Sequence, residues 1–434
     1  MDESTTKKSG QFEDDALDPV PLDKRQHWIT PAMIFGGLEF CIPVIMIGST
    51  LIGSFSIVQV LVLVLVGFIF FTWPGNTLSA YIGSKTGLAS SVLAKSAFGE
   101  NQARYGVAGL ITLVGLAHWS MQTAVAGNAI CAMFGIDYTA DRGKWVLITI
   151  IAGLIFCIPA VIGYGAMKWT DYIAVPAGLI LCVVAVVLAI RNLGMGTIIA
   201  YRPPAGGMGW LAALNLVISL NTGQLLLCPD YSRYAKPGVK NSILLNLGIV
   251  AVGPPLIFIG ALMAVGAGTA DIVLVMQNLG MPVWGFVVLW VSTWTSQIVN
   301  NYSAGLSLAN LLNIKSSKGR ATATVIATLI AIGLALTGVL EKITIVYQIT
   351  GICMPAVASI MFVDFFLKKK DIYITTRWNV VATIATLLGV FVGYLTTYLT
   401  PWGIPALQSL VITALVYYIG MKYTSYGKTN LQRA

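Results

Sequence analysis

Charged residues are scarce in this sequence: they make up 10% of its 434 residues, whereas hydrophobic residues make up 57%. Soluble globular domains carry about 25% charged residues. The composition therefore excludes a soluble protein and predicts one that is built from hydrophobic segments.

Residues that carry covalent or metal chemistry are also scarce. The chain has two histidines and six cysteines; every cysteine falls within an apolar stretch, and no metal-site spacing occurs among them. The sequence has no catalytic triad, no His-Glu-x-x-His motif and no nucleotide-binding fingerprint, and its glycine-rich segment 206–209 lacks the lysine of a P-loop. We therefore expect neither an enzyme nor a resident cofactor.

Long apolar stretches, in contrast, are abundant. A helix needs about 20 apolar residues to cross a bilayer, and stretches of that length follow one another along the chain. We predict an all-α membrane protein with twelve transmembrane helices. The predicted spans are 29–52, 56–81, 104–134, 145–165, 170–190, 210–229, 241–267, 281–312, 321–339, 343–367, 378–398 and 402–424.

The net charge of +9 comes from lysine and arginine residues that are distributed unevenly between the predicted loops. If the N-terminus lies inside the cell, 21 of the 26 Lys and Arg residues fall in inner segments and five in outer ones. An excess of Lys and Arg is typical of cytoplasmic loops. The basic excess therefore indicates a multi-pass protein of the cell inner membrane with both termini cytoplasmic, and not a partner of nucleic acid.

The first and sixth predicted spans carry polar or helix-breaking residues in corresponding places. Span 1 contains Glu39 and Pro43, and span 6 contains Asn221, Gly223, Gln224 and Pro229. Unwound backbone at mid-membrane depth persists only where it lines a cavity, and paired interruptions of this kind point to a transporter's binding site. We predict that both spans are broken and that they border such a site.

Spans 1–5 and 6–10 are interpreted as two structural repeats, because each set begins with an interrupted span and has a long third span. The expected organisation is a flexible cytoplasmic tail at 1–28, repeat 1 at 29–190, repeat 2 at 210–367, two further spans within 378–424 and a cytoplasmic tail at 425–434. In five-plus-five inverted repeats the substrate and ion sites lie between spans 1, 3, 6 and 8.

Glu39 is the only acidic residue placed deep in a predicted span. It lies about ten residues into span 1, or roughly 15 Å from the membrane surface, and a charge at that depth costs about 3 kcal/mol or more. One hypothesis is that Glu39 binds substrate or carries a proton. The other is a protonated side chain that hydrogen-bonds the exposed backbone at the helix break.

Span 3 carries His118, Trp119 and Gln122. An aromatic ring can stack on the flat face of a purine or pyrimidine, and an amide can hydrogen-bond its polar edge. These residues are therefore candidate substrate contacts. The alternative is structural: Trp119 packs in the core or faces lipid, and His118 bonds to a neighbouring helix.

Span 8 is the most polar span. Ser292, Thr295 and Ser296 share one helical face, and hydroxyls beside the free carbonyls of a broken helix offer an all-oxygen site for Na⁺. Gln297 and Asn301 share another face, where two amides would suit the edge of a heterocycle. The alternative for both sets is helix–helix packing, in which Ser and Thr are common.

Four segments, in order along the chain, resemble the nucleobase–cation symporter-1 family. CPDYSRYAKP at 228–237 is similar to that family's Asp-Phe/Tyr-Ser-Arg-Tyr/Phe signature. AYIGSKTGLASSVLAKSAFG at 80–99 resembles its span 2–3 loop, GAMKWTDYIAVPA at 165–177 its span 4–5 connection, and NYSAGLSLANL at 301–311 the end of its span 8. On the basis of these four segments the chain is identified as a member of this family, which includes the cytosine permeases.

The resemblance implies twelve helices, in a LeuT-type five-plus-five inverted repeat plus two extra helices, and alternating access. It implies a symporter that imports a nucleobase, cytosine- or purine-like, with Na⁺ or H⁺. The alternatives are a permease for another small heterocycle, such as hydantoin, allantoin or a vitamin-precursor pyrimidine, and a non-accumulating channel or sensor. We expect the chain to be a monomer. Its expected partners are the nucleobase-like substrate, the coupling cation and the lipid bilayer.

The resemblance also implies site residues. For the cation these are the backbone carbonyls near Cys41 and Val44, the carbonyl of Ser292 and the hydroxyls of Thr295 and Ser296. The substrate contacts, together with Glu39 from the analysis of span 1, are His118, Trp119, Gln122, Leu220, Asn221, Gln297 and Asn301.

Three positions depart from the family pattern. His118 stands where the family usually has Trp, Asn221 where an aromatic residue is common, and Glu39 where a small or neutral residue is typical. We therefore expect a more polar and more ionisable pocket than that of a cytosine permease. The identity of the heterocycle and the choice between Na⁺ and H⁺ stay open.

Overall fold

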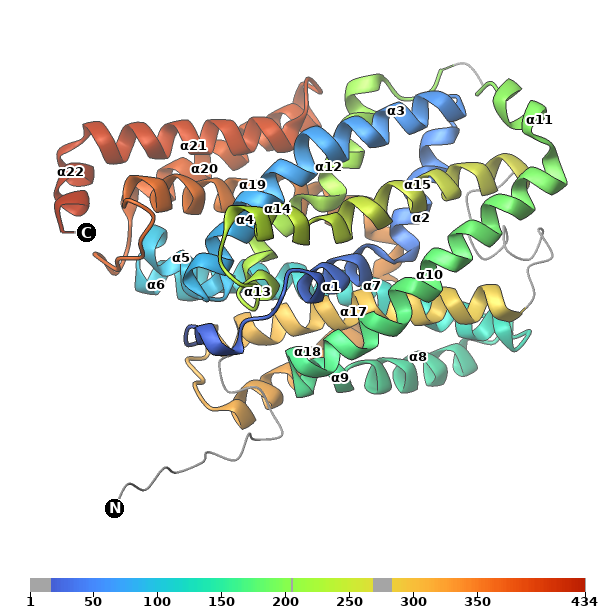
Figure 1. Ribbon diagram of the computed structural model, residues 1–434, viewed down its shortest axis with the longest axis horizontal. Helices are drawn as coiled ribbons and strands as arrows, with labels where there is room; N and C mark the ends of the chain where they lie inside the picture. Colours follow the sequence, from blue (N-terminus) through green and yellow to red (C-terminus); the bar gives the residue numbers. More distant parts are fainter. Residues whose placement is uncertain (1–16, 204–205, 268–282, 434) are drawn as a thin grey trace.

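The computed structural model describes residues 17–203, 206–267 and 283–433. Within these residues every regular element is a helix, apart from an isolated parallel bridge between Gln26 and Ala235. Most of the longer helices run roughly along the long axis of the molecule (Figure 1). The predicted all-α class is confirmed.

The predicted spans correspond to helices or to pairs of helices joined end to end. Their bounds are Ile29–Glu39 (α1) with Ile42–Ile52 (α2), Ile57–Gly67 (α3) with Trp73–Thr86 (α4), Ala108–Met133 (α7), Arg142–Phe156 (α8) with Ile158–Ile162 (α9), Tyr164–Leu193 (α10), Trp210–Leu227 (α12) with Pro229–Ser232 (α13), Val239–Leu245 (α14) with Leu247–Ala267 (α15), Val283–Leu311 (α17), Ser317–Leu336 (α18), Ile343–Leu367 (α19), Val380–Tyr394 (α20) and Pro405–Tyr423 (α21). Short helices between or after them are Ser90–Phe98 (α5), Glu100–Gln102 (α6), Met195–Ala200 (α11) and Ser425–Gln432 (α22).

Length and hydropathy single out seven helical segments of the described chain that could cross a bilayer, or eight if the bent pair α1 and α2 counts as one span. The other four predicted spans coincide with α7, α10, α17 and α21, which are 19 to 30 residues long. The helices are therefore consistent with twelve spans.

Local sequence explains where the second span begins and ends. Ser56 and Gln59 form a reciprocal capping box at the start of α3, so two backbone N–H groups of the first turn are satisfied. Five π-helical residues at 68–72 connect α3 to α4. Gly87 ends α4 with φ of 75°, a left-handed conformation that glycine adopts without steric cost.

Span 1 is broken where the sequence predicts it. The α1 helix ends at Glu39, Cys41 is extended with φ −144° and ψ 154°, and α2 leaves at an angle of 55° to α1. Pro43 occupies the first turn of α2, where a missing N–H group costs nothing. The first predicted interruption is therefore confirmed.

In span 6 the predicted interruption at the polar residues is wrong. The α12 helix runs without a break through Asn221 and Gln224 and ends at Leu227, so no unwound backbone occurs at these polar residues. Pro229 does remove the N–H group that Leu225 O would accept from in a helix. Ser79 Oγ on α4 donates to that carbonyl at 2.8 Å instead, which lets the chain remain helical through Pro229.

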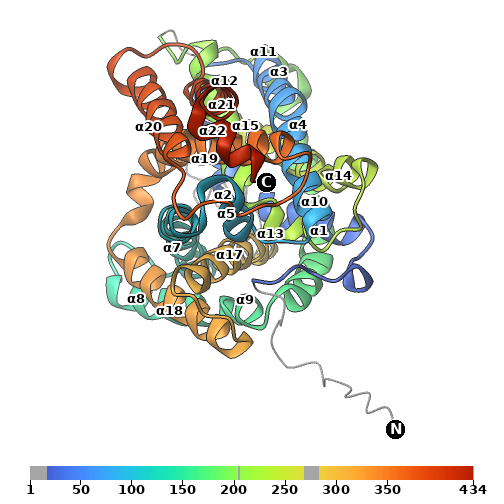
Figure 2. The ribbon, with the colours of Figure 1, turned by 90° about the vertical axis from the view of Figure 1, so that its left-hand side faces the viewer.

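The helices form two groups that lie side by side. The first group comprises α1, α2, α3, α4, α12 and α15, and the second comprises α7, α8, α17 and α18; within each group the helices pack on one another. The α10 helix contacts both groups, and α19 packs between α12 and the final pair α20 and α21. In the end view, α7, α8, α17 and α18 gather below α12, α19 and α21 (Figure 2).

Glycines allow α2 and α15 to approach each other closely. A Cβ at Gly48 would overlap the carbonyl oxygen of Ile257, and one at Gly260 would overlap that of Ile45. Ser49 Oγ donates to Gly260 O at 3.1 Å across the same contact. Small residues permit such close backbone contact between membrane helices, so α2 is held firmly in the first group.

Part of the predicted N-terminal tail is held against the helices. Gln26 N donates to Tyr234 O at 2.7 Å. The guanidinium of Arg25, a buried residue, donates to the carbonyl oxygen of Ser84. Residues 17–28 therefore pack at the ends of α4 and α13. At the other end, part of the predicted C-terminal tail folds as α22.

Candidate functional site

A cavity of about 50 Å³ lies where α1 gives way to α2, between the two helix groups. Five elements line it: the α1–α2 break, α7, α12, α17 and α19. The lining residues are Leu38, Glu39, Cys41, Val44, Val114, His118, Gln122, Leu220, Asn221, Gly223, Gln224, Leu227, Ser296, Asn300, Tyr347 and Thr350. We call this space the central cavity.

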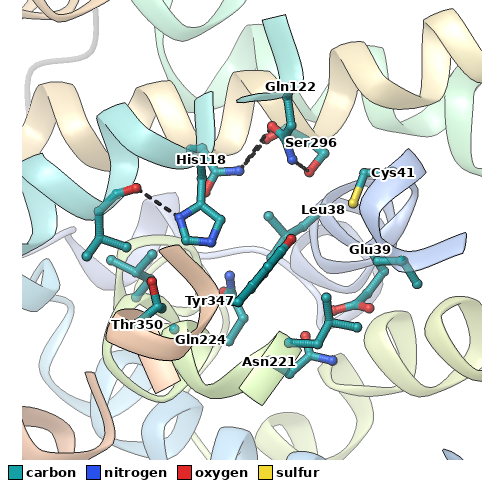
Figure 3. A pocket seen from close by; sticks show the side chains of 16 residues that line it. Leu38, Glu39, Cys41, His118, Gln122, Asn221, Gln224, Ser296, Tyr347 and Thr350 are labelled. Atoms are coloured by element: carbon teal, nitrogen blue, oxygen red, sulfur yellow. Dashed lines mark hydrogen bonds between the residues drawn. The ribbon is translucent and has the colours of Figure 1, made fainter. Parts of the chain in front are cut away.

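Glu39 reaches the central cavity because it is the last residue of α1. The residue is 2% exposed, and its Oε2 has no hydrogen-bond partner among the described residues. The carboxyl group and the Asn221 amide point toward one another across the cavity (Figure 3). Gly253 on α15 makes room for the carboxyl group, since a Cβ there would lie 2.8 Å from Oε2. The acid is thus placed at the site beside the Asn221 amide, with Oε2 left without a partner in the described part of the chain.

His118 lines the cavity from α7. Its Nδ1 lies 2.9 Å from Val114 O, and because a carbonyl can only accept, Nδ1 carries a proton in this contact. In the neutral ring this leaves Nε2 as a hydrogen-bond acceptor. The imidazole therefore offers the cavity an acceptor, while its own orientation is fixed by α7.

Three polar side chains join α7 to α17 at the cavity wall. Gln122 Nε2 donates to Ser296 Oγ at 2.7 Å, and Asn300 Nδ2 donates to Gln122 Oε1 at 3.3 Å. Asn300 Nδ2 also lies 3.0 Å from Ser296 O. The network holds the Gln122 amide in one orientation at the cavity (Figure 3), as a group that recognises a ligand edge requires.

Three of the predicted substrate contacts lie away from the central cavity. Trp119 is fully buried in a cluster with residues of the α9 region and α18. Gln297 Nε2 donates to Thr123 Oγ1 at 3.0 Å, and Asn301 Nδ2 donates to Thr328 Oγ1 at 3.1 Å. Gln297 and Asn301 do share a helical face, but that face packs inside the second group. In this structure all three side chains make packing contacts of the kind the structural alternative describes, and one polar atom of each, Trp119 Nε1, Gln297 Oε1 and Asn301 Oδ1, has no partner among the described residues.

The predicted cation residues gather near the break. Cys41, Val44 and Ser296 line the central cavity. Thr295 Oγ1 donates to Gly37 O at 2.8 Å, so its hydroxyl meets α1 one turn before the carbonyls that the resemblance implies. Ser292 lies on α17 among residues whose side chains are outside the described part of the chain.

Several lining residues were not among the predicted contacts. Asn300 is adjacent in sequence to Asn301 but lies about 100° around α17 from it, on the face toward the cavity. Gln224 contributes an Oε1 that has no partner among the described residues. Tyr347 and Thr350 come from α19, and their polarity within an apolar span was the signal available in the sequence.

A second and larger cavity of about 530 Å³ adjoins the first. It is bordered by α2, α12, α19 and the loop between α20 and α21, with Met46, Asn215 and Trp402 among its lining residues. Tyr347 lines both cavities. The tyrosine ring therefore stands between the two spaces, and we call the larger one the vestibule.

The family model described as permease for cytosine/purines, uracil, thiamine, allantoin matches residues 19–420. The cytosine permease of Escherichia coli strain K12 is 27% identical over 383 residues, which cover 87% of this chain and 88% of that protein. The fold is similar to that of Mhp1, a nucleobase-cation-symport-1 family transporter solved in a closed conformation with bromovinylhydantoin bound: the TM-score is 0.79 at 17% identity, over 98% of this chain and 100% of that one. A Na⁺-coupled sialic acid symporter has a TM-score of 0.66 at 14% identity, over 96% and 93% of the two chains.

Proposed function

This chain belongs to the family of permeases for cytosine/purines, uracil, thiamine and allantoin, and we propose that it imports a nucleobase-type nitrogen heterocycle together with a cation by alternating access. The substrate occupies the central cavity. In this proposal the chain acts as a monomer in the inner membrane, with both termini in the cytoplasm, as the distribution of Lys and Arg indicates.

The observation that carries the proposal is the composition of the cavity wall at the break in span 1. A carboxyl, an imidazole, amides and hydroxyls project into a small space that is also bordered by Leu38, Val44 and Leu220. Heterocyclic bases are flat, with apolar faces and hydrogen-bonding edges. The mixture of apolar side chains and convergent polar groups suits such a ligand and is typical of small-molecule sites.

The position of the cavity between the two helix groups supports alternating access. Groups that move relative to each other around a fixed central site expose it to one side of the membrane at a time. Residues 29–190 and 210–367 are the two repeats in this proposal, and each group takes helices from both. The vestibule lies on the side of the loop between α20 and α21, which the charge distribution assigns to the outside.

Coupling requires that the cation favour one state of the carrier, since a ligand shifts a conformational equilibrium only by its differential affinity. The end of α1 is suited to this role because its last carbonyls carry the negative end of the helix dipole. Na⁺ is the coupling ion of the proposal, with H⁺ as the alternative. The hydrogen bond from Thr295 to Gly37 O joins α17 to α1, so a movement of α1 against α17 would change it.

Uptake into proteoliposomes tests the function directly. We expect cytosine, a purine, uracil, allantoin or hydantoin to accumulate above its external concentration when an inward Na⁺ or H⁺ gradient is imposed, and the same compound to raise the melting temperature of the purified protein. Equilibration without accumulation would identify a channel. The absence of both uptake and stabilisation for all of these heterocycles would refute the proposal.

A further inference from the structure

Asp171 is a buried acid that belongs to neither cavity. It lies in the third turn of α10 and is 1% exposed. Its Oδ1 has no hydrogen-bond partner, and it forms no ion pair with a Lys or Arg of the described residues. A buried carboxylate without a partner is strongly unfavourable, so this position calls for a ligand. The sequence indicated Glu39 as the only acid deep in a span. The structure shows that Asp171 is a second acid buried within the helix bundle.

The carboxyl group of Asp171 lies directly against the last turn of α1. A Cβ added at Gly37 would overlap Asp171 Oδ1 and would lie 3.3 Å from Thr295 Cβ. Three helices, α1, α10 and α17, therefore bring Gly37, Asp171 and Thr295 together. The glycine is what lets the carboxyl group approach the backbone of α1.

The break in span 1 also changes the hydrogen bonding of Gly37 O. In a continuous helix this carbonyl would accept from the N–H group four residues later, at Cys41. Here Cys41 N donates to Glu39 O at 2.8 Å, and Gly37 O accepts from Phe40 N at 3.2 Å and from Thr295 Oγ1 at 2.8 Å. Gly37 thus offers a carbonyl released from regular helix geometry to a hydroxyl, and the Cα of the same residue faces an unpartnered carboxyl oxygen.

Carboxylate, carbonyl and hydroxyl oxygens are the donors that hard cations prefer. The negative end of the α1 dipole adds to the charge of the carboxylate at this point. We propose that Asp171 is the anionic ligand of a monovalent cation site for Na⁺, which Gly37 O and Thr295 Oγ1 complete. The Asp171 carboxylate then neutralises the positive charge of the ion, whose burial would otherwise be costly. The bound ion also links α10 to the contact between α1 and α17.

This inference extends the proposed symport, but Na⁺ binding can be measured without any substrate. Thermal unfolding of the purified protein is followed while NaCl replaces choline chloride at constant ionic strength. We expect Na⁺ to raise the melting temperature saturably and K⁺ to do so at least tenfold less effectively. Asp171→Asn should weaken the apparent Na⁺ affinity at least tenfold, and Asp171→Ser should do the same if the amide variant does not fold. Asp141→Asn, which changes a surface acid on the same chain, should leave the Na⁺ response unchanged.

Two results would overturn the proposal: no effect of Na⁺ on the wild-type protein, or a folded Asp171→Asn variant with the wild-type Na⁺ response. Stabilisation by nucleobases in choline buffer reports on the central cavity separately. Binding of nucleobases without any effect of Na⁺ would therefore reject this inference and leave the proposed substrate in place. A Na⁺ response without binding of any heterocycle would do the reverse.

Discussion

The ring of Tyr347 meets the imidazole of His118 edge-on, with the ring centroids 5.2 Å apart and the planes at 80°. Tyr347 belongs to α19 and His118 to α7, so this contact joins the second helix group to the helix that borders the vestibule. Because the tyrosine lines both cavities, the pair lies where the central cavity and the vestibule meet. Edge-to-face ring pairs of this kind contribute about 0.5–1.5 kcal/mol.

Removing the ring of Tyr347 is expected to merge the two cavities. Tyr347→Ala should weaken binding of the transported heterocycle about tenfold, which corresponds to about 1.4 kcal/mol, because water would then reach the central cavity. Tyr347→Phe keeps the ring and should stay within about twofold of the wild type in affinity. Dissociation constants from ligand-induced thermal shifts decide this. An equal loss in both variants would show that the hydroxyl matters and the ring does not.

The carboxyl group of Glu39 gives a prediction about proton coupling. If Glu39 carries the proton, Glu39→Gln should abolish uptake driven by a pH gradient, because the amide cannot take up and release a proton in the transport range. Substrate exchange at equal concentrations should persist, since it requires no net proton movement. Uptake and exchange in proteoliposomes test this, with Glu100→Gln, an exposed position at the start of α6, as the control. Unchanged pH dependence in Glu39→Gln would eliminate the proton-carrier hypothesis.

Adjacent asparagines on α17 offer a matched pair. Asn300 lines the central cavity and holds Gln122, whereas Asn301 bonds to Thr328 inside the second group. Asn300→Ala should reduce substrate affinity roughly tenfold, because a hydrogen bond and the orientation of the Gln122 amide are lost. Asn301→Ala should mainly lower the melting temperature and keep the affinity. The opposite pattern would show that the substrate lies on the other face of α17.

Gly48 gives a prediction about stability. A Cβ at this position overlaps the backbone of α15 at Ile257 O, and backbone yields less readily than a side chain. Gly48→Ala should therefore destabilise the protein by about 1–3 kcal/mol, seen as a lower melting temperature. Gly109→Ala in α7 is the control, because nothing lies within 4 Å of its added Cβ. A Gly48→Ala variant as stable as the control would mean that α2 and α15 can separate at little cost.

Much of the site could be predicted from residue type alone. Glu39, His118, Gln122 and Asn221 are polar in spans that are otherwise apolar, and all four line the central cavity. A polar side chain in a membrane helix must face a cavity, a partner or a helix end, so composition narrows the choice. Composition does not distinguish a side chain that faces a cavity from one that bonds to a neighbouring helix. Gln297 was predicted as a substrate contact on the same grounds as the other four, but its amide bonds to Thr123 in the structure.

The sequence by itself determined the helical class, the positions of the spans, the family and the break at Glu39. These follow from hydropathy, from the charge of the loops and from local backbone preferences, each of which acts within a few residues of the chain. The tertiary structure decided which side of α17 faces the substrate, that α12 continues through Asn221, and that Asp171 lies beside Gly37. These relationships depend on contacts between helices far apart in sequence, such as Ser79 with Leu225 O and Thr295 with Gly37 O, and no local pattern encodes the rotation of one helix against another.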